Sequence, residues 1–175
     1  MIDYLKDIVQ HTYGLGVIST IKVTGTDKTT TIDSFDQATK TVILNAEFKA
    51  PVAEFVGTFG MPNLDRLNTI LNLPVYKENA KITIKHRADN NLPEGLHFEN
   101  AVGDFKNDYR YMAEGVINDK LKAVKFKGVS WNIEFEPTVQ NIQRMRFQAA
   151  ANSEETTFTA KTEDGDLKFF FGDPN

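Results

Sequence analysis

A helix opened by a proline occurs twice in the sequence, and this repetition limits what the chain can fold into. The first copy is Gly60–Leu71, "GMPNLDRLNTIL", and the second is Glu136–Arg146, "EPTVQNIQRMR". Proline suits the first turn of a helix because its φ is fixed near the helical value. Aligning Pro62 with Pro137 brings apolar residues at helical spacing opposite one another. The three pairs are Leu64 with Val139, Leu67 with Ile142, and Ile70 with Met145. We therefore predict helices over 62–73 and 137–151.

The two copies stay in register beyond the helix. The offset between them is 75 at the proline (137 − 62) and 76 where "ITIK", starting at Ile82, meets "FTAK", starting at Phe158 (158 − 82). An N-terminal helix over 2–13 supplies a third copy, since Ile2 to Ile21 spans the same 19 residues as Val139 to Phe158. Each copy is a helix followed by a β-hairpin, and a strand precedes the two later helices. This order predicts an α+β fold built from repeated units.

The other elements follow from alternation and turn residues. We expect the last hairpin to turn at "EDGD" (163–166), a sequence that suits a tight turn. For 52–59 a helix also fits the spacing, but "FVGTFG" favours a strand. The lysine-rich stretch 113–128 lacks a clear pattern, which indicates a connector. The expected strands cover 17–23, 29–35, 41–48, 52–59, 81–86, 95–100, 104–112 and 130–136.

Composition and charge exclude several classes of protein. No apolar run approaches the roughly 18–20 residues that cross a membrane, and the N-terminus lacks the basic region of a signal peptide. The absence of cysteine excludes disulfides and thiolate chemistry and is compatible with the cytoplasm. A formal net charge of −4 argues against a protein that coats nucleic acid, although a local basic patch is still allowed.

No catalytic or metal-binding pattern is present in the sequence. His11, His86 and His97 are isolated from one another and from acids at ligand spacing. There is no glycine-rich phosphate loop, and the acids of "TEDGD" lack the spacing of a calcium loop. No serine has the context of a nucleophile elbow. We therefore expect neither an enzyme, nor a metal site, nor a cofactor.

The surface of the helices is then the remaining place for a function. The polar sides are rich in amides and sparsely basic, which fits a solvated helix face as well as a binding surface. By helical phase, Arg144 lies in the middle of the polar side of 137–151, whereas Arg146 projects toward the apolar side. The polar residues are Asp3, Lys6, Asp7, Gln10 and His11 on the first helix, Asp65, Arg66, Asn68, Thr69 and Asn72 on the second, and Gln140, Asn141, Arg144 and Gln148 on the third.

A denser basic cluster lies in the connector. Its lysines could solvate an edge or bind a partner, and the sequence leaves both open. The cluster consists of Lys120, Lys122, Lys125 and Lys127.

Repeated strand–helix–hairpin units around a lysine-containing connector resemble a DNA sliding clamp, the processivity factor of a DNA polymerase. The resemblance is closest to the clamps of large tailed bacteriophages, particularly those of marine cyanobacteria, and covers most of the chain from about residue 40 onward. The stretches that carry it are "VGTFGMPNLDRLNTILNLPVYKENAKI", "GLHFENAVGDFKNDYRYM", "KLKAVKFKGVSWNIEFEP", "IQRMRFQAAANSEE" and "TAKTEDGDLKFFFGD".

The resemblance implies a fold and a division into domains. Clamp subunits have two similar domains, and three subunits close into a ring around duplex DNA with helices lining the hole and sheets outside. Here it implies a first domain over 1–112, a connector over 113–128 and a second domain over 129–175. The sequence ends after one helix and one hairpin of that second domain, so it resembles a truncated clamp whose ring closure is in question.

The resemblance also implies partners and site residues. A clamp does no chemistry; it slides on duplex DNA and tethers the polymerase, after a clamp loader has placed it. Arg144 matches the basic position of the second-domain helix, with Lys6, Arg66 and Arg146 as weaker candidates for facing DNA. Partner peptides bind near the connector, where we expect a pocket formed by Val116, Ile117 and Leu121. The alternative is a phage structural or assembly protein of repeated α+β units that does not bind DNA.

Overall fold

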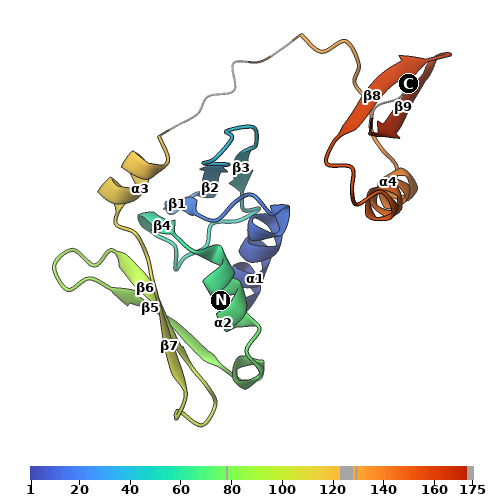
Figure 1. Cartoon of the computed structure of the whole chain (residues 1–175). Coiled ribbons are helices and arrows are strands. Elements are labelled where there is room, and N and C mark those ends of the chain that lie inside the picture. Colours follow the sequence, from blue (N-terminus) through green and yellow to red (C-terminus); the bar gives the residue numbers. More distant parts are fainter. Residues whose placement is uncertain (78, 123–127, 129, 173–175) are drawn as a thin grey trace. The chain divides into compact units, whose positions relative to one another are not determined.

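The computed structural model of the chain describes residues 1–77, 79–122, 128 and 130–172. The chain is a mixed α+β protein with antiparallel sheets. It divides into two compact units, Met1–Lys127 (unit 1) and Gly128–Asn175 (unit 2). The helices and strands of both are drawn in Figure 1. Among the described residues, no helix combines the length and the apolar character needed to cross a membrane.

Unit 1 contains a four-stranded sheet, in the order β3-β2-β1-β4, and a three-stranded sheet, in the order β5-β6-β7. Two short 3-10 helices, η1 and η2, follow α1 and α2. The helices are α1 (Ile2–His11), η1 (Tyr13–Leu15), α2 (Leu64–Leu71), η2 (Pro74–Tyr76) and α3 (Glu114–Lys120). The strands are β1 (Ile21–Gly25), β2 (Thr30–Phe35), β3 (Ile43–Glu47), β4 (Gly57–Met61), β5 (Lys81–His86), β6 (Pro93–Glu99) and β7 (Lys106–Arg110).

The first half of unit 1 is α1 with the three strands that follow it. The apolar stripe predicted for the first helix is buried through Leu5, Ile8 and Val9. Burial alternates along β1 and β2 as expected for strands with one face on the core, and Val23 pairs with Ile32. Thr30, at the start of β2, is also buried. This half therefore follows its hydrophobic pattern closely.

The second half repeats this order as β4, α2 and the three strands β5, β6 and β7. The two halves are joined where β1 pairs with β4 in antiparallel register, Val23 opposite Phe59. Within the second half, Gly60 of β4 exchanges two backbone hydrogen bonds with Met112, just after β7, at 3.0 and 2.8 Å between nitrogen and oxygen, which ties the two sheets together. The four-stranded sheet thus contains strands from both halves.

The two helices α1 and α2 pack together on the same side of the sheets (Figure 1). One hydrophobic core joins them to both sheets, with Leu5 of α1, Leu67 of α2, Val23 of β1 and Phe98 of β6 among its fully buried members. Because the apolar sides of both helices face this core, their polar sides are left to solvent.

The segment 52–59 is only partly the strand expected. Val52–Phe55 forms a turn closed by a 2.9 Å hydrogen bond from the Phe55 amide to the Val52 carbonyl, and β4 begins at Gly57. Val52 and Phe55 are nonetheless buried, 1% and 0% exposed. Their side chains reach the core from a turn. The apolar spacing of this segment therefore matches a strand in part and a helix in part.

The expectation of an unpatterned connector over 113–128 is wrong for its first part. Residues 114–120 form α3, and Ile117 on this helix is fully buried against β4. This helix belongs to unit 1, which therefore extends beyond residue 112. Lys125 and Lys127 lie outside the described residues. Lys120 and Lys122 are exposed.

Unit 2 consists, in its described part, of α4 (Val139–Ala151) and a hairpin of β8 (Phe158–Glu163) and β9 (Asp166–Phe171). The hairpin turns at Asp164 and Gly165, both with positive φ, which confirms the turn predicted at "EDGD". The strand expected over 130–136 is wrong, because these residues pair with no other strand that the structure describes. An extended segment becomes a strand only when a neighbour completes its hydrogen bonds.

Candidate functional site

The polar sides of α1 and α2 are exposed as predicted, but they are not basic. Their charged residues, counting His11 as neutral, are three carboxylates and two cations, which gives a formal charge of −1 (2 − 3). This side of unit 1 can touch an anionic polymer through single cations but cannot hold it tightly by charge. The carboxylates belong to Asp3, Asp7 and Asp65, and the cations to Lys6 and Arg66.

Arg66 has a structural contact in addition to its exposure. Its Nη2 donates a hydrogen bond of 3.0 Å to the backbone carbonyl of Asp108, so the side chain ties α2 to β7. Nearby, the Tyr109 hydroxyl donates to the Pro62 carbonyl at the start of α2. Burial raises the pKa of Tyr109 strongly, and the charge of Arg66 opposes this only in part. A guanidinium has five N–H donors, so Arg66 can keep this bond and still contact a phosphate.

Lys6 lies in a more acidic neighbourhood than Arg66. It is exposed on α1 between Asp3 and Asp7 in the sequence, and Asp7 in turn accepts from His11, whose Nδ1 is 3.1 Å from the Asp7 Oδ1. Like the surrounding carboxylates, it is well solvated, so its attraction for a phosphate is screened and reduced. Lys6 is therefore a weaker candidate than Arg66 for contacting DNA.

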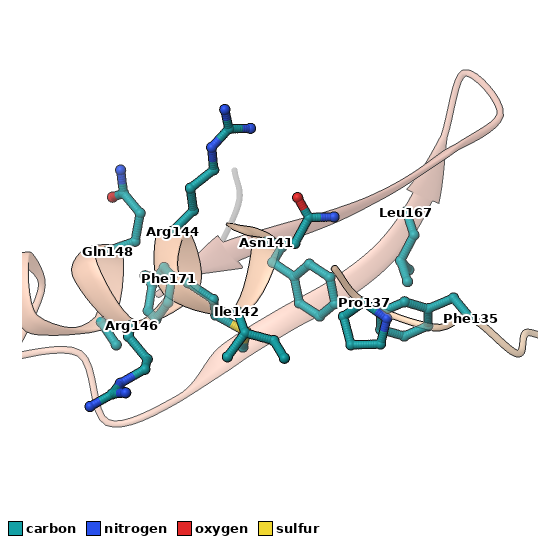
Figure 2. Close-up of a pocket in the computed structure, with 12 residues that line it drawn as sticks. Phe135, Pro137, Asn141, Ile142, Arg144, Arg146, Gln148, Leu167 and Phe171 are labelled. Atoms are coloured by element: carbon teal, nitrogen blue, oxygen red, sulfur yellow. The ribbon is translucent and has the colours of Figure 1, made fainter. Parts of the chain in front are cut away.

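Among the helices that the structure describes, α4 is the one that carries cations and no carboxylate. The Thr138 hydroxyl caps its N-terminus by accepting a 3.1 Å hydrogen bond from the Asn141 amide. Arg144, Asn141 and Gln148 point the same way in Figure 2, and Arg146 points the opposite way, in agreement with the predicted phase. No acid interrupts Val139–Ala151. Arg144 therefore lies on an amide-rich, uncharged background, which suits contact with a phosphate better than the acidic setting of Lys6.

A groove of about 790 Å³ lies between α4 and the hairpin of unit 2 (Figure 2). Its apolar lining is Phe135, Pro137, Ile142, Met145, Ala149, Leu167, Phe169 and Phe171. Both arginines of α4 border it, but the guanidinium of Arg144 points away from it in Figure 2. The sequence indicated that a partial second domain would leave an apolar face uncovered, but it did not show which hairpin residues would form the groove with this helix.

The three connector residues expected to line a partner pocket are not together at the surface. Val116 is 55% exposed, whereas Ile117 and Leu121 are buried at 0% and 4%. Ile117 packs on Gly60 of β4, and Leu121 lies by β2 and β3, next to Phe35 and Ile43. As the chain stands, a partner peptide could contact Ile117 or Leu121 only if α3 moved. The two residues anchor α3 to the sheet.

One charged surface escaped the sequence analysis. On the exposed face of the three-stranded sheet, Asp108 accepts from Lys85 at 2.8 Å and lies 2.7 Å from the Nδ1 of His97. Hydrogen bonds from Lys85 and then His97 lower the pKa of the Asp108 carboxyl. Arg110 and Glu94 form a further pair, at 3.4 Å. These residues lie on neighbouring strands, so only knowledge of the strand register could have brought them together.

Within the described residues, no group of three or more histidine, aspartate, glutamate or cysteine side chains is placed to hold a metal ion. Comparison with known proteins adds no identity: no family model matches the chain, and no curated protein matches it significantly.

Proposed function

We propose that the chain is a subunit of a DNA sliding clamp of the type found in large tailed bacteriophages. The observation that carries the proposal is the arrangement of unit 1. Two halves, each a helix with antiparallel strands, are joined through β1 and β4. Both helices pack on one side of the sheets with their polar sides free. A clamp domain needs this separation, with helices toward DNA and sheets away from it.

The weak charge of the helices supports the same proposal. A clamp must remain on duplex DNA and still slide, so its contacts with phosphates have to be few and independent of sequence. Arg144, Arg66 and Lys6 would supply such contacts from helices rich in amides. In this proposal the protein works in the cytoplasm of a bacterial host, where a clamp loader places it and a DNA polymerase binds it.

A binding experiment tests which surface meets DNA. We expect weak association with a fluorescein-labelled 30-bp duplex at low salt, measured by fluorescence anisotropy, with no dependence on sequence. Arg144→Ala should weaken binding several-fold and lower the salt slope by about 0.9, the value for one phosphate contact. Arg110→Ala, a matched loss of one exposed arginine on the sheet face, should change neither.

Loss of binding in Arg110→Ala but not in Arg144→Ala would place DNA on the sheet and contradict the proposal. A second experiment tests encirclement. Protein threaded onto a bead-bound duplex should resist a high-salt wash only when the free end is blocked, and cleavage of the duplex should release it. Equal retention on duplexes with blocked and with free ends would indicate ordinary binding to DNA without encirclement.

A phage structural or assembly protein is the second candidate. The observation that favours it is the apolar groove of unit 2, because exposed apolar surfaces of this kind mark sites of association. The two candidates separate experimentally. An assembly protein should associate with protein and show no affinity for duplex DNA at any salt concentration.

A further inference from the structure

Unit 2 has an apolar face that nothing in its described part covers. In the hairpin, Phe158 pairs with Phe171 and Ala160 with Phe169, which places these three phenylalanines on one face. The opposite face carries Lys161, its pairing partner Lys168, and Phe170, whose ring centroid lies 5.0 Å below the Lys161 Nζ. The first of these faces forms the groove with α4, and none of the described residues of unit 2 is buried. The apolar residues of unit 2 are therefore arranged as in a hydrophobic core, but none of those that the structure describes is buried.

The internal repeat shows what this face would look like when covered. Leu64 and Leu67 of α2 are both fully buried, whereas their counterparts in the repeat, Val139 and Ile142 of α4, are 73% and 48% exposed. In unit 1, the cover is the other half: α1 packs beside α2, and β1 pairs with β4. A helix-and-hairpin unit of this design is thus covered by another unit of the same design.

We infer that the apolar face of unit 2 pairs with the same face of unit 2 in a second copy of the chain. The two halves of unit 1 already bury each other in one core, so their apolar faces are occupied. The unit of matching design with an uncovered face is unit 2 of another copy. Pairing identical faces gives a closed, two-fold dimer. This inference does not depend on DNA binding.

The exposed apolar area is enough for such a dimer. Phe135, Ile142, Phe158 and Phe169 are between 37% and 57% exposed. At about 200 Å² for a large side chain, these four supply roughly 400 Å². A standard interface buries about 800 Å² per partner, of which roughly 60% is apolar. Four side chains therefore provide most of the apolar area that one partner must contribute.

The charges at the groove predict how salt affects the pairing. Arg144 and Arg146 border the groove, and no carboxylate is among its lining residues. Two copies that pair through this face bring like charges closer, and salt screens that repulsion. Association of the chain should therefore strengthen as salt rises. DNA binding should weaken over the same range, so the two processes are distinguishable in one titration series.

Sedimentation velocity of the full chain over a concentration series tests the inference. We expect a dimer of the 175-residue chain at high concentration. Ile142→Asp, in the groove, should raise the dissociation constant at least tenfold. Phe147→Asp is the matched control, because Phe147 is more exposed, at 74%, but is not among the groove residues.

A cross-linking pair keeps the test independent of any loss of folding. The chain has no cysteine, so Ala149→Cys in the groove and Ala151→Cys on the other side of α4 each introduce a single thiol. A flexible bis-maleimide should link two copies through position 149 and not through position 151. A monomer at all concentrations, equal weakening by both aspartate variants, equal linking at both positions or linking at neither would each overturn the inference. Far-UV circular dichroism, compared with that of the unsubstituted chain, verifies that each variant is folded.

Discussion

The contact between α3 and β4 predicts a thermodynamic coupling between Gly60 and Ile117. A Cβ added to Gly60 would lie 2.7 Å from the Ile117 Cδ1, 2.8 Å from its Cγ1 and 3.0 Å from its Cβ. Non-bonded carbon atoms do not approach so closely, so Gly60→Ala must push α3 away from the sheet. Overpacking of this kind costs about 1–3 kcal/mol of the free energy of unfolding.

Ile117→Ala acts on the same contact in the opposite direction. Ile117 is 0% exposed, so truncation removes its buried methyl groups and leaves a cavity, at a cost of about 2–5 kcal/mol. In the double variant the new methyl of residue 60 enters the space that Ile117 vacated. The combined loss should therefore be smaller than the sum of the two single losses by about 1–3 kcal/mol, within the range measured for residues in contact.

Urea unfolding of the full chain measures this coupling in unit 1. All five tyrosines lie at or before position 111, so their near-UV circular dichroism reports on unit 1. Val116→Ala is the control, because Val116 is the neighbour of Ile117 on α3 and is 55% exposed. Its effect should stay within about 0.5 kcal/mol, as for most surface substitutions.

Additive losses, or an Ile117→Ala variant as stable as the control, would refute the reasoning. Either result would mean that α3 does not pack on β4 in solution. Ile117 would then be free to meet a partner peptide, as the sequence analysis expected.

Three further predictions concern the stability of unit 1. Gly115→Ala should stabilise it by about 0.5–1 kcal/mol in urea unfolding, because residue 115 is helical and an added Cβ meets nothing within 4 Å; a loss of stability would contradict the helix. Gly25→Ala should destabilise it by at least about 3 kcal/mol, since the new Cβ would lie 1.5 Å from the Phe55 carbonyl oxygen, and an unchanged urea midpoint would disprove that packing. The lowered pKa of Asp108 contributes stability above the unfolded value near 3.9, which is lost as pH falls toward the lower folded value. Asp108→Asn should therefore slightly reduce the difference between the urea midpoints measured at pH 7 and at pH 3. A larger difference in the variant would mean that ionisation of Asp108 destabilises the folded chain, which contradicts the prediction.

Local sequence patterns were sufficient to predict those helices and hairpins whose hydrogen bonds are made within the element itself. The α2 helix follows from a stripe that ends in Leu67, Ile70 and Leu71, and the last hairpin follows from Asp164 and Gly165 at its turn. The expectation that Pro62 and Pro137 occupy the first helical turn is wrong, because the N-cap residues are Asn63, with a left-handed φ of 52°, and Thr138, so both prolines lie just outside the helices. These elements need only their own residues to be specified.

The failures share a different cause. Residues 130–136 have the alternation of a strand, but a strand also requires a partner, and hydrophobic alternation cannot show whether one is present. The segment 114–120 has a single deeply buried residue, Ile117, and a short helix with one buried residue leaves no periodic signal. In both cases the missing information concerned a distant part of the fold.

The features of the candidate site also divide into those that local pattern predicts and those that depend on tertiary contacts. Helical phase places Arg144 and Arg146 on opposite sides of α4 from the sequence alone, and Figure 2 shows them so. It could not show that Arg66 donates to the carbonyl of Asp108, 42 positions away. Nor could it show that Lys85 and His97 meet at one carboxylate. The periodicity of a sequence carries no information about contacts between side chains on different elements.

The two sides of α4 make the proposed functions separable. Arg144, Gln148 and Ile142 all border the groove, but in Figure 2 the side chains of Arg144 and Gln148 point away from that of Ile142, so DNA contact and pairing would use neighbouring surfaces of one helix. Arg144→Ala should then weaken DNA binding without weakening the dimer, and should strengthen the dimer slightly by removing a positive charge near the interface. Ile142→Asp should abolish pairing and leave a monomer whose single Arg144 still meets phosphate. A dimer carries two such arginines on one body, so its affinity for duplex DNA should exceed that of the monomer through effective concentration alone.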